Sequence, residues 1–122
     1  MAYAYDSQNI FARILRGEIP NKTVLDTAHT LAFHDISPAA PVHVLVIPKG
    51  AYVSFDHFAA EASAEEIVDF HRACAKVCEL VGVAPGEGFR AITNAGANGH
   101  QEVPHYHLHI LGGRALGPLI AR

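Results

Sequence analysis

The chain lacks the features that mark membrane-bound or nucleic-acid-binding proteins. Its 9 Lys and Arg residues are outnumbered by 12 Asp and Glu residues and form no basic block, so we expect neither nucleic acid nor an anionic membrane as a partner. No apolar run approaches the roughly 20 residues that span a bilayer. The opening segment MAYAYDSQN has neither a charged n-region nor an apolar core of signal-peptide length, which predicts a cytoplasmic protein.

Cysteine is also scarce. The only two, Cys74 and Cys78, lie four residues apart in a helical pattern. They could form half of a metal site or a redox pair, but we interpret them as small apolar residues in a buried helical stripe. Half of the residues are hydrophobic and 17% are charged, which is typical of a folded protein. Because no repeat, low-complexity tract or linker divides the chain, we expect residues 1–122 to form a single domain.

Hydrophobic periodicity predicts an α+β fold. Helical spacing indicates a short N-terminal helix over residues 7–16 and a long helix over residues 63–81, where Ser63-Ala64-Glu65-Glu66 fits a capping box. The order of elements is helix, three strands, helix, two strands, which favours a five-stranded, largely antiparallel sheet. The expected strands cover residues 23–25, 31–35, 42–47 and 89–94, with a fifth in the histidine-rich segment near the C-terminus.

Three histidines alternate with apolar residues in the segment HYHLHILGG. In an extended chain His105, His107 and His109 emerge on one face, and the residues between them on the other. Three neutral imidazoles and a water can form an open zinc site, and two of these three could chelate. However, same-face neighbours on a strand lie roughly 6.5 to 7 Å apart, so the outer two cannot easily share one ion. We therefore expect no metal and no cofactor.

Nucleophilic attack on phosphorus suits the row better. It requires a neutral imidazole whose Nδ1 proton is held by a carbonyl and whose Nε2 is free. His107 is the natural nucleophile because His105 and His109 flank it, and neighbouring donors can balance the charge of the phosphate oxygens. His43, in APVHVLVIPK, can join the row if its strand pairs with the last one. A histidine held in the core by a backbone carbonyl is an equally good interpretation of His43.

The segment HYHLHIL resembles the HxHxHxx signature of the histidine triad superfamily. NIFARILRGEIP, AFHDISPAAPVHVLVIPK and EVPHYHLHILGGR resemble, in this order and over nearly the whole chain, its nucleotide-binding branch. HQEV before the triad and GGRALGPLIAR after it are most similar to bacterial members. The resemblance implies a purine nucleoside phosphoramidase, which hydrolyses the P–N bond of adenosine or guanosine 5′-monophosphoramidates through a nucleotidylated histidine and without a metal.

The resemblance also implies roles for particular residues. His107 would be the nucleophile and His109 a phosphate contact, while His105 and His43 would belong to a supporting proton network. Asp35 would bind the ribose hydroxyls, although a carboxylate there can equally cap the loop at Ser37. Asn94 would lie near the leaving group, and phosphate contacts would come from Gln101, Glu102 and Val103. The base pocket would be formed by Ile10, Phe11, Ile14, Ile19, Phe33, His34 and Ile36, of which the first three also suit plain helix packing.

Alternatives remain within this resemblance. The transferase branch carries glutamine at the third triad position, so His109 favours hydrolysis. Hydrolysis of dinucleoside polyphosphates is the second enzymatic hypothesis, and a purine-nucleotide sensor with vestigial hydrolysis is the non-enzymatic one. Members of the branch are homodimers that join their sheets edge to edge and pair their long helices. His100 follows Gly99 where relatives commonly have a second glycine, which predicts either a bulkier phosphate loop or a different backbone angle in it.

Overall fold

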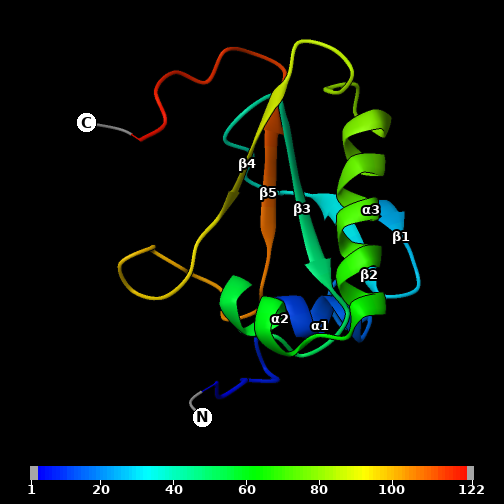
Figure 1. Ribbon diagram of the computed structural model, residues 1–122, viewed down its shortest axis with the longest axis vertical. Coiled ribbons are helices and arrows are strands. Elements are labelled where there is room, and N and C mark those ends of the chain that lie inside the picture. The colour runs from blue at the N-terminus through cyan, green and yellow to red at the C-terminus, as the bar shows by residue number, and fades with distance from the viewer. Residues whose placement is uncertain (1–2, 121–122) are drawn as a thin grey trace.

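The structure, a computed structural model, describes residues 3–120 and has an α+β architecture built on one sheet (Figure 1). The helices are α1 (Ile10–Leu15), α2 (Phe55–Glu61) and α3 (Ala64–Leu80). The strands are β1 (Thr23–Asp26), β2 (Thr30–His34), β3 (Val42–Pro48), β4 (Phe89–Thr93) and β5 (Leu108–Gly112). No helix within residues 3–120 is both long and apolar enough to cross a membrane.

The five strands form an antiparallel sheet in the order β1-β2-β3-β5-β4, which confirms the predicted fold class. The last strand in the chain therefore inserts between β3 and β4. In the β3–β5 pair His43 lies opposite Leu111, and Leu45 lies opposite His109. Because side chains alternate along a strand, this register brings His43 and His109 to the same face.

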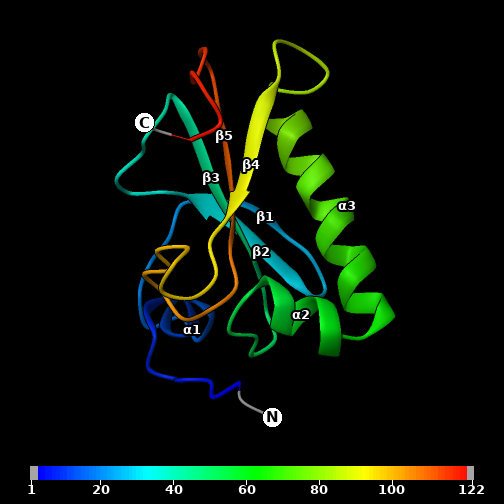
Figure 2. The ribbon, with the colours of Figure 1, turned by 60° about the vertical axis from the view of Figure 1, so that its left-hand side comes forward.

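Both faces of the sheet are covered, and by different helices (Figures 1 and 2). Alternate residues of β3 enter two separate cores, as expected for a strand buried on both sides. Val44 and Val46 pack with Phe70 and Val77 of α3. On the opposite face Leu45 and Ile47 pack with Phe11 and Ile14 of α1. The α1 face is the one that carries the histidines.

Helix α3 forms as the sequence predicts. Ser63 is its N-cap, and both hydrogen bonds of the capping box with Glu66 are present. Cys74 and Cys78 are unpaired and lie in the apolar stripe that packs on the sheet. Burial raises the pKa of Cys74 to about 12, which disfavours the thiolate that metal binding or redox chemistry needs. Their placement agrees with the packing interpretation.

Two boundaries and one additional helix differ from the expectation. Helix α1 begins at Ile10 instead of residue 7, because the Asn9 side chain accepts from the Ala12 amide and caps the helix there. Helix α2 was not predicted: it is short, and its N-cap Ser54 makes no side-chain capping bond. Strand β5 begins only at Leu108, after the first two histidines.

Asp69 of α3 fastens the turn between β1 and β2 to the helix. One of its carboxylate oxygens accepts from the hydroxyls of Thr27 (2.6 Å) and Thr30 (2.8 Å) and from the amide of His29 (3.1 Å). Burial acts to raise the pKa of this carboxyl, but the three donors outweigh it and hold the pKa below its ordinary value. The ionised carboxylate therefore stabilises the fold.

We expect Asp69→Asn to lower the free energy of unfolding by about 1–2 kcal/mol at neutral pH, because the hydrogen bonds to a charged acceptor become neutral ones. A carboxyl whose pKa is depressed by folding stabilises above its unfolded pKa, near 4, and stops doing so as the pH falls through its folded pKa. Urea unfolding should thus show the variant and the wild type converging in acid. Glu65→Gln, an exposed position on the same helix, is the matched control and should stay within about 0.5 kcal/mol. An equal loss in both variants would contradict this role of Asp69.

Candidate active site

The histidine row keeps its alternation in the residues that precede β5. Tyr106 and Ile110 are buried in the core beneath α3. His105 and His107 lie on the opposite face, where the ring of Phe11 packs edge-on against that of His107 with ring centroids 4.9 Å apart. His109 follows on the same face, its ring centroid 5.1 Å from that of His107. The structure therefore brings the three predicted histidines together.

The hydrogen bond of His107 fixes which of its nitrogens can react. Its Nδ1 lies 2.7 Å from the backbone carbonyl oxygen of His105. A carbonyl only accepts, so Nδ1 carries the proton, and Nε2 of the neutral ring has a free lone pair. Nε2 has no hydrogen-bond partner within residues 3–120. In this part of the chain, every fully buried side-chain nitrogen and oxygen has a partner, so Nε2 is not fully buried. We infer that Nε2 opens toward solvent, as a nucleophile requires.

Burial keeps the four imidazoles neutral. It lowers the pKa of His107 below its ordinary value and lowers the pKa of His105 to about 4. The pKa of His109 also falls to about 4, through burial and then through its neighbours His107 and His43. Burial lowers the pKa of His43 as well, against the opposing effect of Asp35. At neutral pH each ring therefore has one donor and one acceptor nitrogen.

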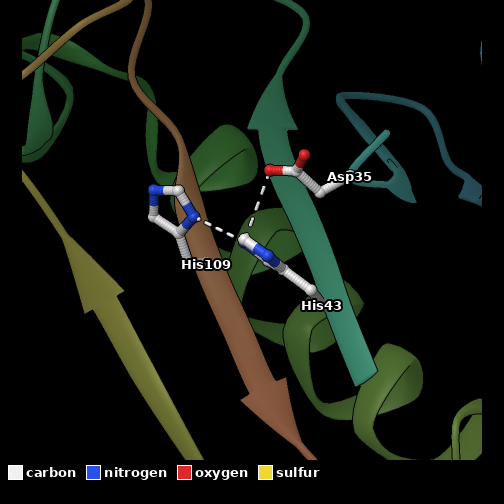
Figure 3. A group of neighbouring side chains, drawn as sticks. All are labelled: Asp35, His43 and His109. Atoms are coloured by element: carbon white, nitrogen blue, oxygen red, sulfur yellow. Dashed lines mark hydrogen bonds and ion pairs between the residues drawn. The ribbon is translucent and has the colours of Figure 1, made fainter. Parts of the chain in front are cut away.

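Backbone contacts then order a chain of hydrogen bonds through His43 and His109. The Ala39 amide donates to Nδ1 of His43 (3.0 Å), which places the proton of His43 on Nε2. That Nε2 lies 2.9 Å from Nδ1 of His109, to which it donates (Figure 3). His109 must then carry its own proton on Nε2. The row thus presents a lone pair at His107 and an N–H donor at His109.

The same ordering argues against a metal. Asp35, His43 and His109 offer three ligand atoms within 4.8 Å of one another, the one such group of three or more within residues 3–120. A metal there would bind the lone pair of His43 Nε2. That nitrogen carries the proton of the neutral ring, because Nδ1 accepts the hydrogen bond from the Ala39 amide. His43 would have to become an imidazolate or lose the amide bond. The group therefore fits a hydrogen-bond chain better than it fits an ion.

Asp35 fills one of the two roles that the sequence left open, the capping of its loop, while its binding of ribose hydroxyls stays a prediction. One carboxylate oxygen caps the loop by accepting from the Ser37 amide (2.8 Å). The other lies 3.4 Å from Nε2 of His43 (Figure 3). It also lines two adjoining cavities, so its second oxygen lies where a ligand could reach it.

The residues expected to form a base pocket line one apolar cavity of about 240 Å³. All seven are present in its wall: Ile10, Phe11, Ile14, Ile19, Phe33, His34 and Ile36. Val103 and Leu45 contribute as well. A second cavity of about 550 Å³ shares His34, Asp35 and Ile36 with the first, and continues past Lys22 to His43. The first cavity alone is smaller than a typical site for a whole ligand, and the two together are large enough.

The loop before the histidines is held by its own polar side chains. Gln101 donates from its amide to the carbonyl oxygens of Val53 (2.6 Å) and Val103 (3.0 Å). Asn94 donates to the carbonyl of Gly99 (2.7 Å). Both side-chain amides thus brace the loop in this structure, and Glu102 remains exposed.

His100 adopts a left-handed conformation with φ of 59°, a backbone angle that glycine favours, and its side chain is exposed. The change of backbone angle that the sequence suggested is therefore not seen at this position. At Gly99 an added Cβ would come within 2.5 Å of the Ala95 carbonyl oxygen. Position 100 therefore accepts a side chain, and position 99 does not.

Sequence reasoning missed three groups. They are the carbonyl of His105, the amide of Ala39 and the hydroxyl of Tyr5, which lies 2.6 Å from Nδ1 of His105. The first is the nearest in sequence, since it lies two residues before the ring that it holds. No signal in the sequence points to the other two.

Fold and site together define an α+β protein with one antiparallel sheet and a row of buried histidines beside an apolar cavity. Residues 16–116 match the HIT domain family. The chain is 55% identical over 122 residues to a 13.2 kDa HIT-like protein of Azospirillum brasilense, covering 100% of this chain and 99% of that protein. It is 40% identical over 114 residues to the purine nucleoside phosphoramidase of Escherichia coli K12, covering 93% and 94% respectively.

A solved structure, that of a HIT family hydrolase from Clostridium thermocellum, is similar over 95% of this chain and 99% of its own, with a TM-score of 0.85 and 39% identity. The chain belongs to the HIT domain family, and its relatives support a hydrolase.

Proposed function

We propose that this protein is a purine nucleoside phosphoramidase that uses His107 as its nucleophile. The observation that carries the proposal is that two residues lining the apolar cavity also contact histidines of the site. Phe11 lines the cavity and packs against the His107 ring, while Asp35 lines it and reaches His43. A purine in the cavity, with its ribose at Asp35, would direct its 5′-phosphate toward His107. The relationship to the Escherichia coli enzyme supports the same substrate class.

The reaction takes two displacements at phosphorus. In the first, the lone pair of His107 Nε2 forms a bond to phosphorus while the P–N bond of the substrate breaks, and the amine leaves with a proton taken from solvent. In the second, water attacks phosphorus while the bond between phosphorus and Nε2 breaks, which restores His107, releases the nucleoside monophosphate and returns a proton to solvent. His109 donates its Nε2 proton in a hydrogen bond to a non-bridging oxygen and so stabilises the charge that develops there. His43 holds His109 in the required tautomer through their 2.9 Å contact.

A panel of substrates tests this proposal. Adenosine and guanosine 5′-monophosphoramidates should be hydrolysed with a kcat/KM well above that for a dinucleoside polyphosphate. A preference for the polyphosphate would support the other hydrolase hypothesis. Tight binding of AMP without turnover of any member of the panel would support the sensor. Added chelator should leave the rate unchanged, and a loss that zinc restores would contradict the metal-free reaction.

The pH dependence follows from the lowered pKa of His107. Because burial depresses that pKa, the nucleophile stays neutral as the pH falls through the ordinary histidine value, about 6.5. We expect kcat/KM to be flat through this value and to decline only in more acidic solution, measured from roughly pH 4 to pH 8. The fold also loses stability below about pH 6.5, since the unfolded histidines bind protons first. Circular dichroism at each pH separates the two effects, and a decline centred near pH 6.5 in folded protein would contradict the assignment.

We also propose that the protein is a cytoplasmic homodimer. Strand β4 ends the sheet, and the exposed hydrophobic side chains Phe89 on β4 and Leu80 and Val68 on α3 lie on surfaces that a second copy could cover. Two unpaired cysteines suit a reducing compartment. Light scattering coupled to size exclusion should give twice the mass of the chain, and the mass of one chain at micromolar concentration would contradict the dimer.

A further inference from the structure

The segment that precedes α1 is anchored by two tyrosines, each of which contacts a histidine. It runs beneath α1 and α2 in Figures 1 and 2. Tyr3 stacks on His57, with ring centroids 4.2 Å apart, and its hydroxyl donates to Asp56. Tyr5 places its hydroxyl 2.6 Å from Nδ1 of His105. The first tyrosine therefore contacts helix α2, and the second contacts the histidine row.

The contact of the other ring nitrogen of His105 shows that Tyr5 is the donor in their hydrogen bond. Nε2 of His105 lies 2.9 Å from the carbonyl oxygen of Pro48, so it carries the proton. The ring is fully buried and neutral at pH 7, which leaves Nδ1 as an acceptor. Tyr5 must then be the donor. The ring of His105 is thus held from both sides, by a strand carbonyl and by the N-terminal segment.

His105 in turn supports His107. Its backbone carbonyl accepts the Nδ1 proton of His107 at 2.7 Å, and this contact leaves Nε2 of His107 unprotonated. The ring held by Tyr5 and the carbonyl that orients His107 thus belong to one residue. Tyr5 lines neither the apolar cavity nor the cavity beside it, and its hydroxyl is bonded to the His105 ring.

We propose that Tyr5 is a positioning residue for the phosphoramidase reaction: its hydroxyl holds the His105 ring, and through the His105 carbonyl it keeps Nε2 of His107 aimed at phosphorus. This inference rests on the proposed function for its consequence in catalysis. The hydrogen-bond chain from Tyr5 to His107 can be tested without that function. Positioning of a nucleophile affects the chemical step and leaves ground-state binding alone.

Tyr5→Phe tests the hydroxyl by itself, because the ring and its edge-on contact with His105 are retained. We expect kcat for an adenosine phosphoramidate to fall by about tenfold while KM stays within about twofold. Tyr3→Phe is the matched control: it removes a hydrogen bond of the same segment that does not reach the row. We expect it to leave both constants unchanged. Equal losses in the two variants, or an unchanged kcat in Tyr5→Phe, would overturn the proposal.

Nitrogen-15 spectra of the histidine rings separate this inference from the proposed function. In Tyr5→Phe the Nδ1 resonance of His105 should move toward the value of an unbonded lone pair, and the Nδ1 proton of His107 should exchange faster with solvent. Tyr3→Phe should show neither change. If the wild type turned over no phosphoramidate, the proposed function would fail while these spectra still reported the link from Tyr5 to His107. Unchanged His105 and His107 resonances in Tyr5→Phe would refute that link whatever the activity.

Discussion

His107→Ala is expected to abolish phosphoramidate hydrolysis, with kcat at least about 10³-fold below that of the wild type. The substitution removes the only ring of the row that the backbone holds with Nδ1 protonated against a carbonyl, 2.7 Å away, and Nε2 open. No neighbour can replace it, since Nε2 of His105 bonds to the Pro48 carbonyl and that of His109 carries a proton. Steady-state turnover of an adenosine phosphoramidate measures the loss.

Binding should survive in that variant. The apolar cavity keeps all of its lining residues, so we expect the affinity for AMP, measured by calorimetry, to stay within about tenfold. His71→Ala is the matched control, because His71 is exposed on α3, the helix on the other face of the sheet, and it should retain full activity. A His107→Ala protein that binds AMP and still turns over substrate within tenfold of the wild type would refute the nucleophile assignment.

His109→Ala is expected to produce the second largest loss, about 10²- to 10³-fold in kcat, because it removes a preorganised donor to the phosphate oxygens. The tautomer argument makes this prediction specific. The Ala39 amide places the proton of His43 on Nε2, and this nitrogen donates to Nδ1 of His109. The proton of His109 is then on its own Nε2, which can donate to the ligand. The same assay measures the loss, with kcat and KM determined separately.

His109→Gln provides the test of mechanism, because a glutamine amide also donates hydrogen bonds but cannot titrate. We expect it to recover at least about tenfold of the activity that His109→Ala loses. Equal rates in the alanine and glutamine variants would show that hydrogen-bond donation is not what His109 supplies. A His109→Ala variant as active as the wild type would remove His109 from the reaction altogether.

The sequence predicted the parts of this fold that depend on local pattern. The Ser63 capping box set the start of α3, and the alternation through His107 and Ile110 correctly separated the two faces of the sheet. It could not predict α2, a seven-residue helix without a capping side chain. It also overestimated β5, which begins only at Leu108. Just before that start, the Thr93 hydroxyl donates to the His107 carbonyl oxygen at 2.8 Å.

For the site, too, the sequence predicted what depends on local pattern. The spacing HxHxH was enough to gather three imidazoles, and the resemblance to the histidine triad family supplied the cavity residues, all of which line one cavity. What sequence could not supply were contacts between distant segments. The sequence left open whether β3 pairs with β5, and that pairing brings His43 to His109 across 66 positions. The Tyr5 contact with His105, which no pattern indicated, spans 100 positions. Such contacts depend on strand order and on the path of the N-terminal segment, neither of which is encoded in local periodicity.

The account depends on a covalent bond between phosphorus and Nε2 of one histidine, and that bond can be observed directly. Rapid acid-free quenching of the wild-type protein during turnover of an adenosine phosphoramidate, followed by intact-mass measurement, should show a fraction of the chain heavier by one adenylyl group. Peptide mapping should place that group on His107, and His107→Ala should not acquire it. An adduct on another residue, or full turnover with no adduct at any quench time, would contradict the mechanism.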